Sequence, residues 1–445
     1  MKRLTILIAC LLLSACAAGT EMAPLLGPPY DPKIDVERFL ATQDTQEEAA
    51  ILSRLKSQNV SHQLIKAMLR SRPAPIQAPV GLQFNLALDH NGKDYPYALY
   101  VPDKIPAGGQ LPLVIVLHGM GGNGNDTLPA WAERLGRDFI IVCPSYPMGA
   151  WWTKTAEELV LKVILDTRRN YPVDSNRVFL AGLSNGAIGA YMIGMNHPDQ
   201  FAGIVPIAGA ITPRYMHFLV NLRNTPLYLI QGAYDPIFPI NLSRRVFQIL
   251  TDMKYPVVYR EHEEKGTAHG GHFLPESEVG PLVEWMKSQK RENFPKVVRM
   301  TREANHLGRI HWAQISRGNG LAALQIPGPE KEPINIQDGK VATLFAVNLG
   351  RNRFELMGKN VKEAEIYLNS DSIDFNSSIV VILQTLEDKN GQLVPTEKRT
   401  GFNRKVQPDI GILLREFKKN RDPNILFDAK ITVPWEKTTD FAFRL

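Results

Sequence analysis

The stretch Val178-Phe179-Leu180-Ala181-Gly182-Leu183-Ser184-Asn185-Gly186 decides the fold prediction for this chain. An apolar run ends in the pattern Gly-x-Ser-x-Gly, and a segment rich in small residues follows it. This is the pattern of a nucleophile elbow, in which a serine sits on a tight strand-to-helix turn with its hydroxyl lifted clear of the sheet. Glycines two residues before and after the serine remove the Cβ atoms that would crowd this turn. The stretch therefore predicts a strand, a nucleophile at Ser184 and a helix, in that order.

Outward from the elbow, apolar strands alternate with helices. Continuous apolar runs are typical of parallel strands that helices cover on both faces. Before them, two alternating segments joined by Asn91-Gly92 predict a hairpin. The fold class predicted for residues 80–293 is therefore α/β, with a doubly wound, mostly parallel sheet. The expected strands are 81–88, 95–101, 111–117, 139–143, 178–181, 201–211, 226–231 and 257–260, and the expected helices are 128–135, 156–171, 187–196, 242–253 and 279–290.

The pattern changes after Phe294-Pro295, where helical periodicity fades. Short alternating strands separated by turn residues predict an all-β, sandwich-like domain over residues 296–445. The expected strands are 309–315, 322–326, 334–336, 341–347, 378–384 and 425–433.

The N-terminus begins Met1-Lys2-Arg3, continues as an apolar run over residues 4–13 and ends in Ser14-Ala15-Cys16. The run is too short to span a bilayer as a helix and fits a secretory signal. Residues 13–16 resemble the bacterial lipobox, and the resemblance implies lipidation of Cys16 and, with Ala17 next, sorting to the outer membrane. A simple secretion signal cut elsewhere is the alternative. We expect a signal peptide over 1–15, a tether over 16–45 and a helical segment over 46–79, with paired helices from Thr45 to Arg72.

Composition narrows the class of protein. The 445 residues are 44% hydrophobic and 22% charged, which excludes wholesale disorder and a membrane protein with many spans. The net charge of +6 is spread along the chain, so no nucleic-acid partner is predicted. Of the three cysteines, Cys10 lies in the leader and Cys16 is the presumed anchor. Cys143 would then be alone in the body, so neither a disulfide nor a cysteine zinc site is expected.

A serine nucleophile of this kind needs an acid after a later strand. The strand over 226–231 runs into the loop Gly232-Ala233-Tyr234-Asp235-Pro236. Asp235 stands where a carboxylate would orient a histidine above the sheet. The alternative is an ordinary turn aspartate before proline.

The base is chosen among His262, His269 and His272. His262 lies near a strand end among charged residues, so we expect it to face the solvent. His269 and His272 lie in the glycine-rich loop 266–273, just before the last helix of the domain. A base must reach over the strand ends from such a loop, and His272 fits that position better, with His269 as the second candidate. No acidic or cysteine ligands at regular spacing accompany the histidines, so no metal is predicted.

An oxyanion hole is predicted from the loop His118-Gly119-Met120-Gly121-Gly122-Asn123, which follows the strand over 111–117. Glycines let backbone N–H groups point into the site, and the amides of Met120 and Asn185 are the expected donors. The alternative is a phosphate-binding loop, but the Lys-Ser/Thr pair that such a loop requires is missing. The parts together predict that His272 takes the proton of Ser184, Asp235 stabilises the imidazolium, and an acyl-enzyme is hydrolysed without metal or cofactor.

Three aromatic residues follow the strand over 139–143: Tyr146, Trp151 and Trp152. Aromatic rings suit sugar or aromatic groups, so these residues are candidates for substrate binding. A place in the core or in a lid is an equal alternative.

The segments 112–123, 182–186 and 197–209 are similar to secreted bacterial esterases of the α/β-hydrolase superfamily. That group includes polyhydroxybutyrate-depolymerase-like, feruloyl-esterase-like, acetylxylan-esterase-like and dienelactone-hydrolase-like members. The resemblance covers residues 80–293 and implies a membrane-tethered serine hydrolase of carboxylic esters, acting on an acylated polysaccharide or a small ester. Elbows of these families often read Ser-Met-Gly-Gly, whereas this one reads Ser-Asn-Gly-Ala, so the pocket shape can differ. A serine exopeptidase related to prolyl peptidases, or a non-catalytic polysaccharide-binding lipoprotein with a decayed hydrolase domain, are the alternatives.

Overall fold

The structure is a computed structural model that describes residues 30–71, 79–104, 109–266, 269–323, 341–390 and 392–435. The chain divides into two compact units, with the boundary after Ser57. In the smaller unit, helices α1 (Pro32–Ala41) and α2 (Thr45–Ser57) contact each other. The Nε of Arg54 on α2 lies 2.8 Å from Oδ2 of the buried Asp35 on α1. Helix α1 lies within the range expected to be a tether, so that prediction was wrong for residues 32–41.

The larger unit contains an eight-stranded sheet in the order β1-β2-β4-β3-β5-β6-β7-β8 among the described residues. Strands β1 and β2 form the expected hairpin, β2 pairs with β4 in antiparallel fashion, and the six strands from β4 to β8 run parallel to one another. The predicted fold class is confirmed. The strands are β1 (Gly81–His90), β2 (Lys93–Val101), β3 (Leu111–Leu117), β4 (Ile140–Pro144), β5 (Val173–Leu183), β6 (Gly203–Ile207), β7 (Leu227–Gly232) and β8 (Val257–His262).

Helices follow the strands of this sheet in the predicted alternation. They are α4 (Gly124–Leu135), α5 (Lys154–Asn170), α6 (Asn185–Asn196), α7 (Ile240–Asp252) and α8 (Glu276–Ser288), with the short 3-10 helices η1 (Pro147–Gly149), η2 (Pro198–Gln200) and η3 (Pro213–Asn224) between them.

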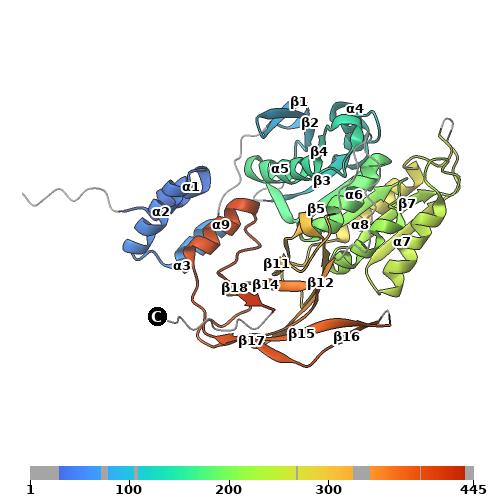
Figure 1. Cartoon of the computed structure of the whole chain (residues 1–445). Coiled ribbons are helices and arrows are strands. Elements are labelled where there is room, and N and C mark those ends of the chain that lie inside the picture. The colour runs from blue at the N-terminus through green and yellow to red at the C-terminus, as the bar shows by residue number, and fades with distance from the viewer. Residues whose placement is uncertain are drawn as a thin grey trace, which may run out of the picture. The chain divides into compact units, whose positions relative to one another are not determined.

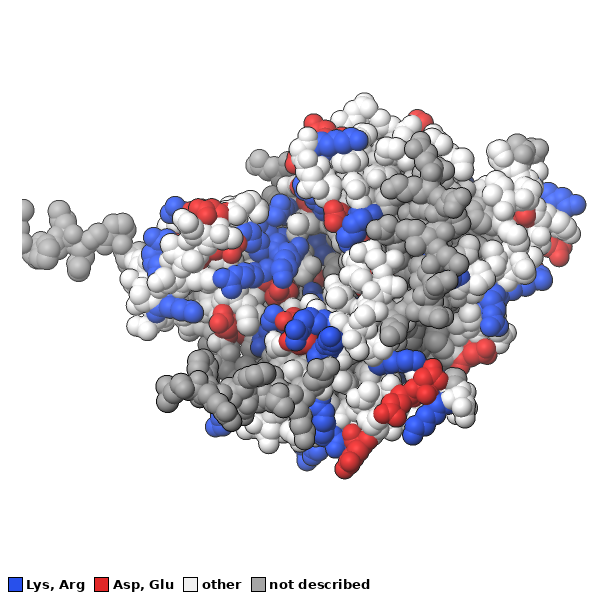
Figure 2. Space-filling model, in the orientation of Figure 1, with Lys and Arg blue, Asp and Glu red and all other residues white. Residues whose placement is uncertain are grey.

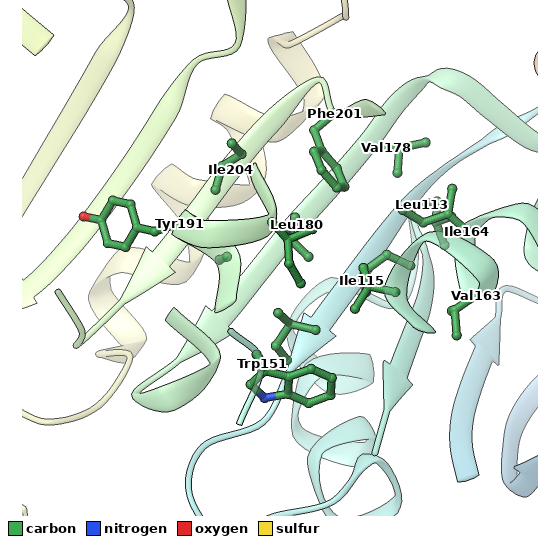
Figure 3. Close-up of a cluster of buried hydrophobic side chains, with 14 of the residues drawn as sticks. Leu113, Ile115, Trp151, Val163, Ile164, Val178, Leu180, Tyr191, Phe201 and Ile204 are labelled. Atoms are coloured by element: carbon green, nitrogen blue, oxygen red, sulfur yellow. The ribbon is translucent and has the colours of Figure 1, made fainter. Parts of the chain in front are cut away.

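Alternate residues of the central strands belong to two hydrophobic cores, one on each face of the sheet. On β3, Leu113 and Ile115 join a core with α5 and α6, whereas Val114 and Val116 join a second core with α4 and α8. Figure 3 shows part of the first core, where Trp151 lies near the side chains of β3 and β5. Because side chains of a strand alternate between faces, burial on both faces explains why these strands are continuously apolar.

The C-terminal region forms two further sheets around one shared core, as predicted for a sandwich. One sheet has the order β10-β11-β14-β18, and the other has the order β16-β15-β13-β12-β9 with β17 also paired to β15. The strands are β9 (Val297–Arg302), β10 (Arg309–Ile310), β11 (Ala313–Gly318), β12 (Ala342–Gly350), β13 (Arg353–Lys359), β14 (Val361–Leu368), β15 (Ile379–Lys389), β16 (Gln392–Pro395), β17 (Arg399–Arg404) and β18 (Ala429–Pro434), and the 3-10 helix η4 (Ala304–His306) follows β9. The strand expected at 334–336, and part of the one expected at 322–326, lie outside the described residues.

Helix α9 (Ile410–Asn420) interrupts the region predicted to be all-β. It buries Leu413, Leu414 and Phe417 and contacts α3 (His62–Arg70). Figure 1 shows α3 and α9 side by side, although they come from opposite ends of the chain. The predicted helical pair is present as α2 and α3, but α3 belongs to the larger unit rather than to one continuous N-terminal segment.

Charged residues of both signs occur side by side on the face shown in Figure 2. Ion pairs within the described residues include Arg244 with Glu261 and Lys287 with Asp138. Within the described residues, no helix is both long and apolar enough to cross a membrane.

Candidate active site

Ser184 lies at the carboxyl end of β5, in the centre of the sheet, and directly before α6. Its backbone has φ 60° and ψ −121°, which is strained for a residue with a side chain and typically costs about 1–3 kcal/mol. A Cβ on Gly182 would overlap the Gly186 carbonyl, and one on Gly186 would overlap the Leu117 carbonyl. The two glycines therefore let β5, β3 and α6 approach closely enough to hold Ser184 in this turn, as the pattern predicts.

Asp235 follows β7 and accepts four hydrogen bonds. Its Oδ1 accepts from the backbone N–H groups of Ile237 (2.8 Å) and Phe238 (3.0 Å). Its Oδ2 accepts from Gln231 Nε2 and from His272 Nδ1, both at 2.9 Å. Burial would raise the pKa of Asp235, but the hydrogen bonds from Phe238, His272 and Ile237 outweigh it and hold the pKa below its ordinary value. Asp235 is therefore an ionised acceptor and not the isolated turn aspartate of the alternative.

Of the three candidate histidines, the structure brings His272 to Asp235. Since the carboxylate can only accept, Nδ1 of His272 carries the proton and Nε2 is left as the basic nitrogen. The ring also stacks on Phe238, with centroids 5.8 Å apart and the planes 16° apart. His269 is exposed, and its carbonyl accepts from the His272 amide at 3.0 Å. The loop thus presents His272, rather than His269, to the carboxylate.

The prediction for His262 was wrong. It was predicted to face the solvent, but it is buried at the end of β8 and its ring packs edge-on against Phe273, with centroids 5.2 Å apart. The charged neighbours Glu261 and Glu263 are exposed, whereas His262 between them is buried. Its carbonyl accepts from the Ala233 amide at 2.8 Å, which joins the end of β8 to the acid loop.

The ends of β5, β6, β7 and β8 are joined by backbone hydrogen bonds. The Ser184 amide donates to Ile207 at 3.0 Å, and the Ala208 amide donates to Ile230 at 2.9 Å. The Gly271 amide donates to Tyr234 at 3.3 Å, which ties the histidine loop to the acid loop. Because these strands are parallel, the loops that carry Ser184, Asp235 and His272 all leave the same edge of the sheet.

The loop after β3 lies against the serine. A Cβ on Gly119 would lie 3.3 Å from the Cβ of Ser184, so the chain passes the nucleophile at this point and Met120 comes next. The second expected donor, Asn185, is the first residue of α6, where backbone N–H groups lack helical partners. The assignment of these two amides as an oxyanion hole stays a prediction.

His118 holds the shape of this loop. Its Nε2 accepts from the Tyr146 amide at 3.1 Å, so its Nδ1 must carry the proton that it shares with the Gly119 carbonyl at 2.7 Å. Burial lowers the pKa of His118, against a smaller raising effect of the Gly119 hydrogen bond. The neutral His118 ring therefore links the loop after β3 to the loop after β4 through its two hydrogen bonds.

The three aromatic candidates have different surroundings. Trp151 is fully buried and donates from Nε1 to the His118 carbonyl at 2.8 Å, so the core alternative holds for it and direct contact with a substrate does not. Tyr146 is half-buried and its hydroxyl accepts from Thr153 at 3.0 Å. Trp152 is also half-buried. The substrate role of Tyr146 and Trp152 stays a prediction.

Two residues that contact this site were not predicted from the sequence. Gln231, fully buried on β7, bridges Ser243 and Asp235 through its amide. Met148 has a positive φ of 55°, and its carbonyl accepts from the Asn185 side chain at 3.2 Å. The signal for Gln231 was a polar residue in the otherwise apolar strand at 227–232, whereas no signal in the sequence marked Met148.

Parts of this chain are similar to known proteins. Residues 153–287 match the phospholipase/carboxylesterase family. A poly(3-hydroxyalkanoate) depolymerase C from Paucimonas lemoignei is 31% identical over 126 residues, which are 25% of this chain and 30% of the depolymerase. The chain thus matches less than a third of the length of that relative.

Among solved structures, a thermostable esterase is similar with a TM-score of 0.41 and 23% identity, over 47% of this chain and 63% of that one. A ferulic acid esterase is similar with a TM-score of 0.38 and 18% identity, over 47% of this chain and 97% of that one. Over residues 153–287 the chain is therefore similar to the phospholipase/carboxylesterase family.

Proposed function

We propose that this protein is a serine hydrolase that cleaves carboxylic esters, with Ser184 as nucleophile, His272 as base and Asp235 as the acid that orients it. The observation that carries the proposal is the 2.9 Å hydrogen bond from His272 Nδ1 to Asp235, on the same sheet edge as the strained Ser184. An ionised carboxylate on Nδ1 selects the tautomer whose Nε2 can accept a proton from the serine.

The reaction proceeds in two halves. In the first, Ser184 Oγ attacks the ester carbonyl while His272 takes its proton, and the same proton then passes to the departing alcohol. In the second, His272 activates a water molecule that hydrolyses the acyl-serine. Amides of Met120 and Asn185 hold the oxyanion of each tetrahedral intermediate, and losing one such donor typically costs about two to three powers of ten in rate.

The test compares ester and peptide substrates with active-site labelling. The protein without residues 1–16 is expected to hydrolyse p-nitrophenyl acetate faster than aminoacyl anilides, and a fluorophosphonate probe is expected to label it. Ser184→Ala should abolish both signals, while Ser288→Ala, which changes an exposed serine at the end of α8, should abolish neither.

Other results of these experiments would favour one of the alternative functions. Faster cleavage of the anilides would favour the exopeptidase. Ester hydrolysis that persists in Ser184→Ala would contradict this nucleophile, and a protein that is neither labelled nor active would favour the non-catalytic binding lipoprotein. A screen across acyl lengths and acetylated xylan would then define the substrate.

Export and anchoring form a second part of the proposal. Its support is the charged start, the apolar run and the Leu13-Ser14-Ala15-Cys16 segment, all of which lie outside the described residues. Acyl chains on Cys16 would hold the enzyme on the outer membrane through their buried methylene groups. The full chain is expected in the membrane fraction and labelled by radioactive palmitate, whereas Cys16→Ser should lose the label. A labelled Cys16→Ser protein would overturn this anchor.

A further inference from the structure

The turn of Met148 lies beside the residues that flank the nucleophile. The Asn185 side chain reaches the Met148 carbonyl at 3.2 Å, and Asn185 directly follows Ser184. On the other side of the turn, a Cβ on Gly149 would lie 2.8 Å from the Gly119 carbonyl. Met148 is therefore placed between the two chain segments expected to supply the oxyanion donors.

The backbone of this turn is held in a costly conformation. Met148 has φ 55° and ψ 8°, in the left-handed region that residues with a side chain rarely adopt. Three hydrogen bonds keep it there: the Asn185 side chain to its carbonyl, the Gly149 amide to the Tyr146 carbonyl (3.0 Å) and the Ala150 amide to the Pro147 carbonyl (3.2 Å). Strain that surrounding contacts maintain is typical of functional sites.

The strained turn directs an apolar side chain into the solvent. Met148 is 63% exposed, although the neighbouring Trp151 is fully buried. Met120, next to Gly119, is 68% exposed. The backbone next to these two methionines is close, since Gly149 lies against the Gly119 carbonyl. Exposed thioethers are suited to an apolar ligand, because they are flexible and polarisable and lose unfavourable contact with water when covered.

The chain segments around Met120 and Met148 carry no charged side chains. The segments 118–125 and 140–153, which include the loops after β3 and β4, contain no Asp, Glu, Lys or Arg. A group that lies against Met120 and Met148 would therefore meet no charge from these two loops. In the proposed reaction that group would be the acyl group, because the acyl carbonyl binds at the expected oxyanion donors, the amides of Met120 and Asn185, and the acyl group stays on Ser184 after the alcohol leaves.

We propose that Met148 is a specificity-determining residue that, with Met120, forms an apolar wall selecting esters with acyl chains longer than acetyl, and that the Asn185 side chain is its positioning residue. The proposal rests on the ester hydrolase function proposed above. It names the substrate class of that site as neutral esters of aliphatic acids.

The test is the ratio of kcat/KM for p-nitrophenyl butyrate to that for p-nitrophenyl acetate, since the two esters share a leaving group. Burial of two extra methylene groups predicts a ratio of roughly ten in the unaltered protein. Met148→Gly removes the side chain and tolerates the positive φ, and Met148→Asn tolerates it with a polar side chain. Both variants are expected to bring the ratio close to one.

Asn185→Ala tests the positioning role. It is expected to lower the same ratio, and the double variant with Met148→Gly should lower it no further, because both changes act through one side chain. Leu393→Ala, which removes an exposed apolar residue on β16, is the matched control and should keep the ratio.

The proposal is overturned if the ratio in Met148→Gly stays within about twofold of the unaltered protein. It is also overturned if the Met148 variants change discrimination among alcohol groups but not among acyl chains. In both cases fluorophosphonate labelling of Ser184 would persist, so the hydrolase function would stand. Loss of all labelling and ester hydrolysis in the unaltered protein would overturn the function and this inference together.

Discussion

The carboxylate of Glu157 on α5 and the imidazole of His306 in the C-terminal region meet at 2.9 Å, between Oε2 and Nε2. Oε1 of the same carboxylate lies 3.1 Å from His197 Nε2, and His306 also pairs with Glu303 through Nδ1. Helix α5 belongs to the hydrolase fold, whereas η4 connects strands of the two C-terminal sheets. These partly buried charges therefore join the hydrolase domain to the sandwich.

The first prediction is that this junction makes stability depend on pH. Burial would lower the pKa of His306, but its bonds to Glu157 and Glu303 outweigh burial and raise it. A histidine with a raised pKa contributes stability that is complete below about pH 6.5 and is lost as the pH rises through the raised pKa. Thermal melts should therefore show Tm falling less steeply above pH 6.5 in His306→Gln than in the unaltered protein. Parallel Tm curves would exclude this contribution.

The contribution of the Glu157 carboxylate to stability depends on pH with the opposite sign. Burial would raise the pKa of Glu157, but the bonds to His197 and His306 outweigh it and lower the pKa. That contribution is present above about pH 4.5 and is lost as the pH falls through the lowered pKa. At neutral pH, Glu157→Gln is expected to reduce the free energy of unfolding by about 1–3 kcal/mol, because one buried acceptor is lost. Urea unfolding measures it, and an unchanged midpoint would contradict it.

Asp235→Asn should lower kcat by about three to four powers of ten with little change in stability, since an amide on Nδ1 can favour the wrong histidine tautomer. The measurement is kcat for p-nitrophenyl acetate, with circular dichroism as a check on folding. Asp252→Asn, at the exposed end of α7, is the matched control and should keep full activity. An Asp235→Asn enzyme within tenfold of the control would remove Asp235 from the proposed triad.

Gln231→Met should weaken the site without removing a member of the proposed triad. The substitution keeps the volume but loses the donor to Asp235 and the acceptor for Ser243 Oγ. We expect the free energy of unfolding to fall by about 1–3 kcal/mol and kcat to fall more than KM changes, because the carboxylate is less firmly oriented. Denaturant unfolding and steady-state kinetics test both parts. An effect on KM alone would show that Gln231 does not position Asp235.

Gly182→Ala should destabilise the elbow, because the new methyl group would overlap the Gly186 carbonyl. Backbone must shift to admit it, which typically costs about 1–3 kcal/mol and would displace Ser184. Gly280→Ala is the matched control: a Cβ there meets nothing within 4 Å, and alanine favours the helix α8 by up to about 1 kcal/mol. Melting temperatures should move in opposite directions, and a neutral Gly182→Ala would contradict the crowding argument.

Local patterns identified most of the sheet and its helices. The strands over 111–117 and 178–183 are apolar on both faces because two cores cover them. Burial on both faces produces runs of consecutive apolar residues, which can be recognised in the sequence. Helix α9 was missed among strands although Leu413, Leu414 and Phe417 have helical spacing, because the surrounding segments alternate with a period of two. Helix α1 was missed because the proline- and glycine-rich segment before it suggested a tether continuing past Pro32.

The sequence by itself determined the elbow at Ser184, because the steric need for Gly182 and Gly186 arises within a few residues of the serine. It also determined the order of strands and helices around that turn, since burial periodicity is local. Only the tertiary structure decided that His272 pairs with Asp235, that His262 and Trp151 are buried and that Asn185 holds Met148. Those facts depend on which loops meet at one edge of the sheet, and contacts between segments tens of residues apart leave no periodic trace in the sequence.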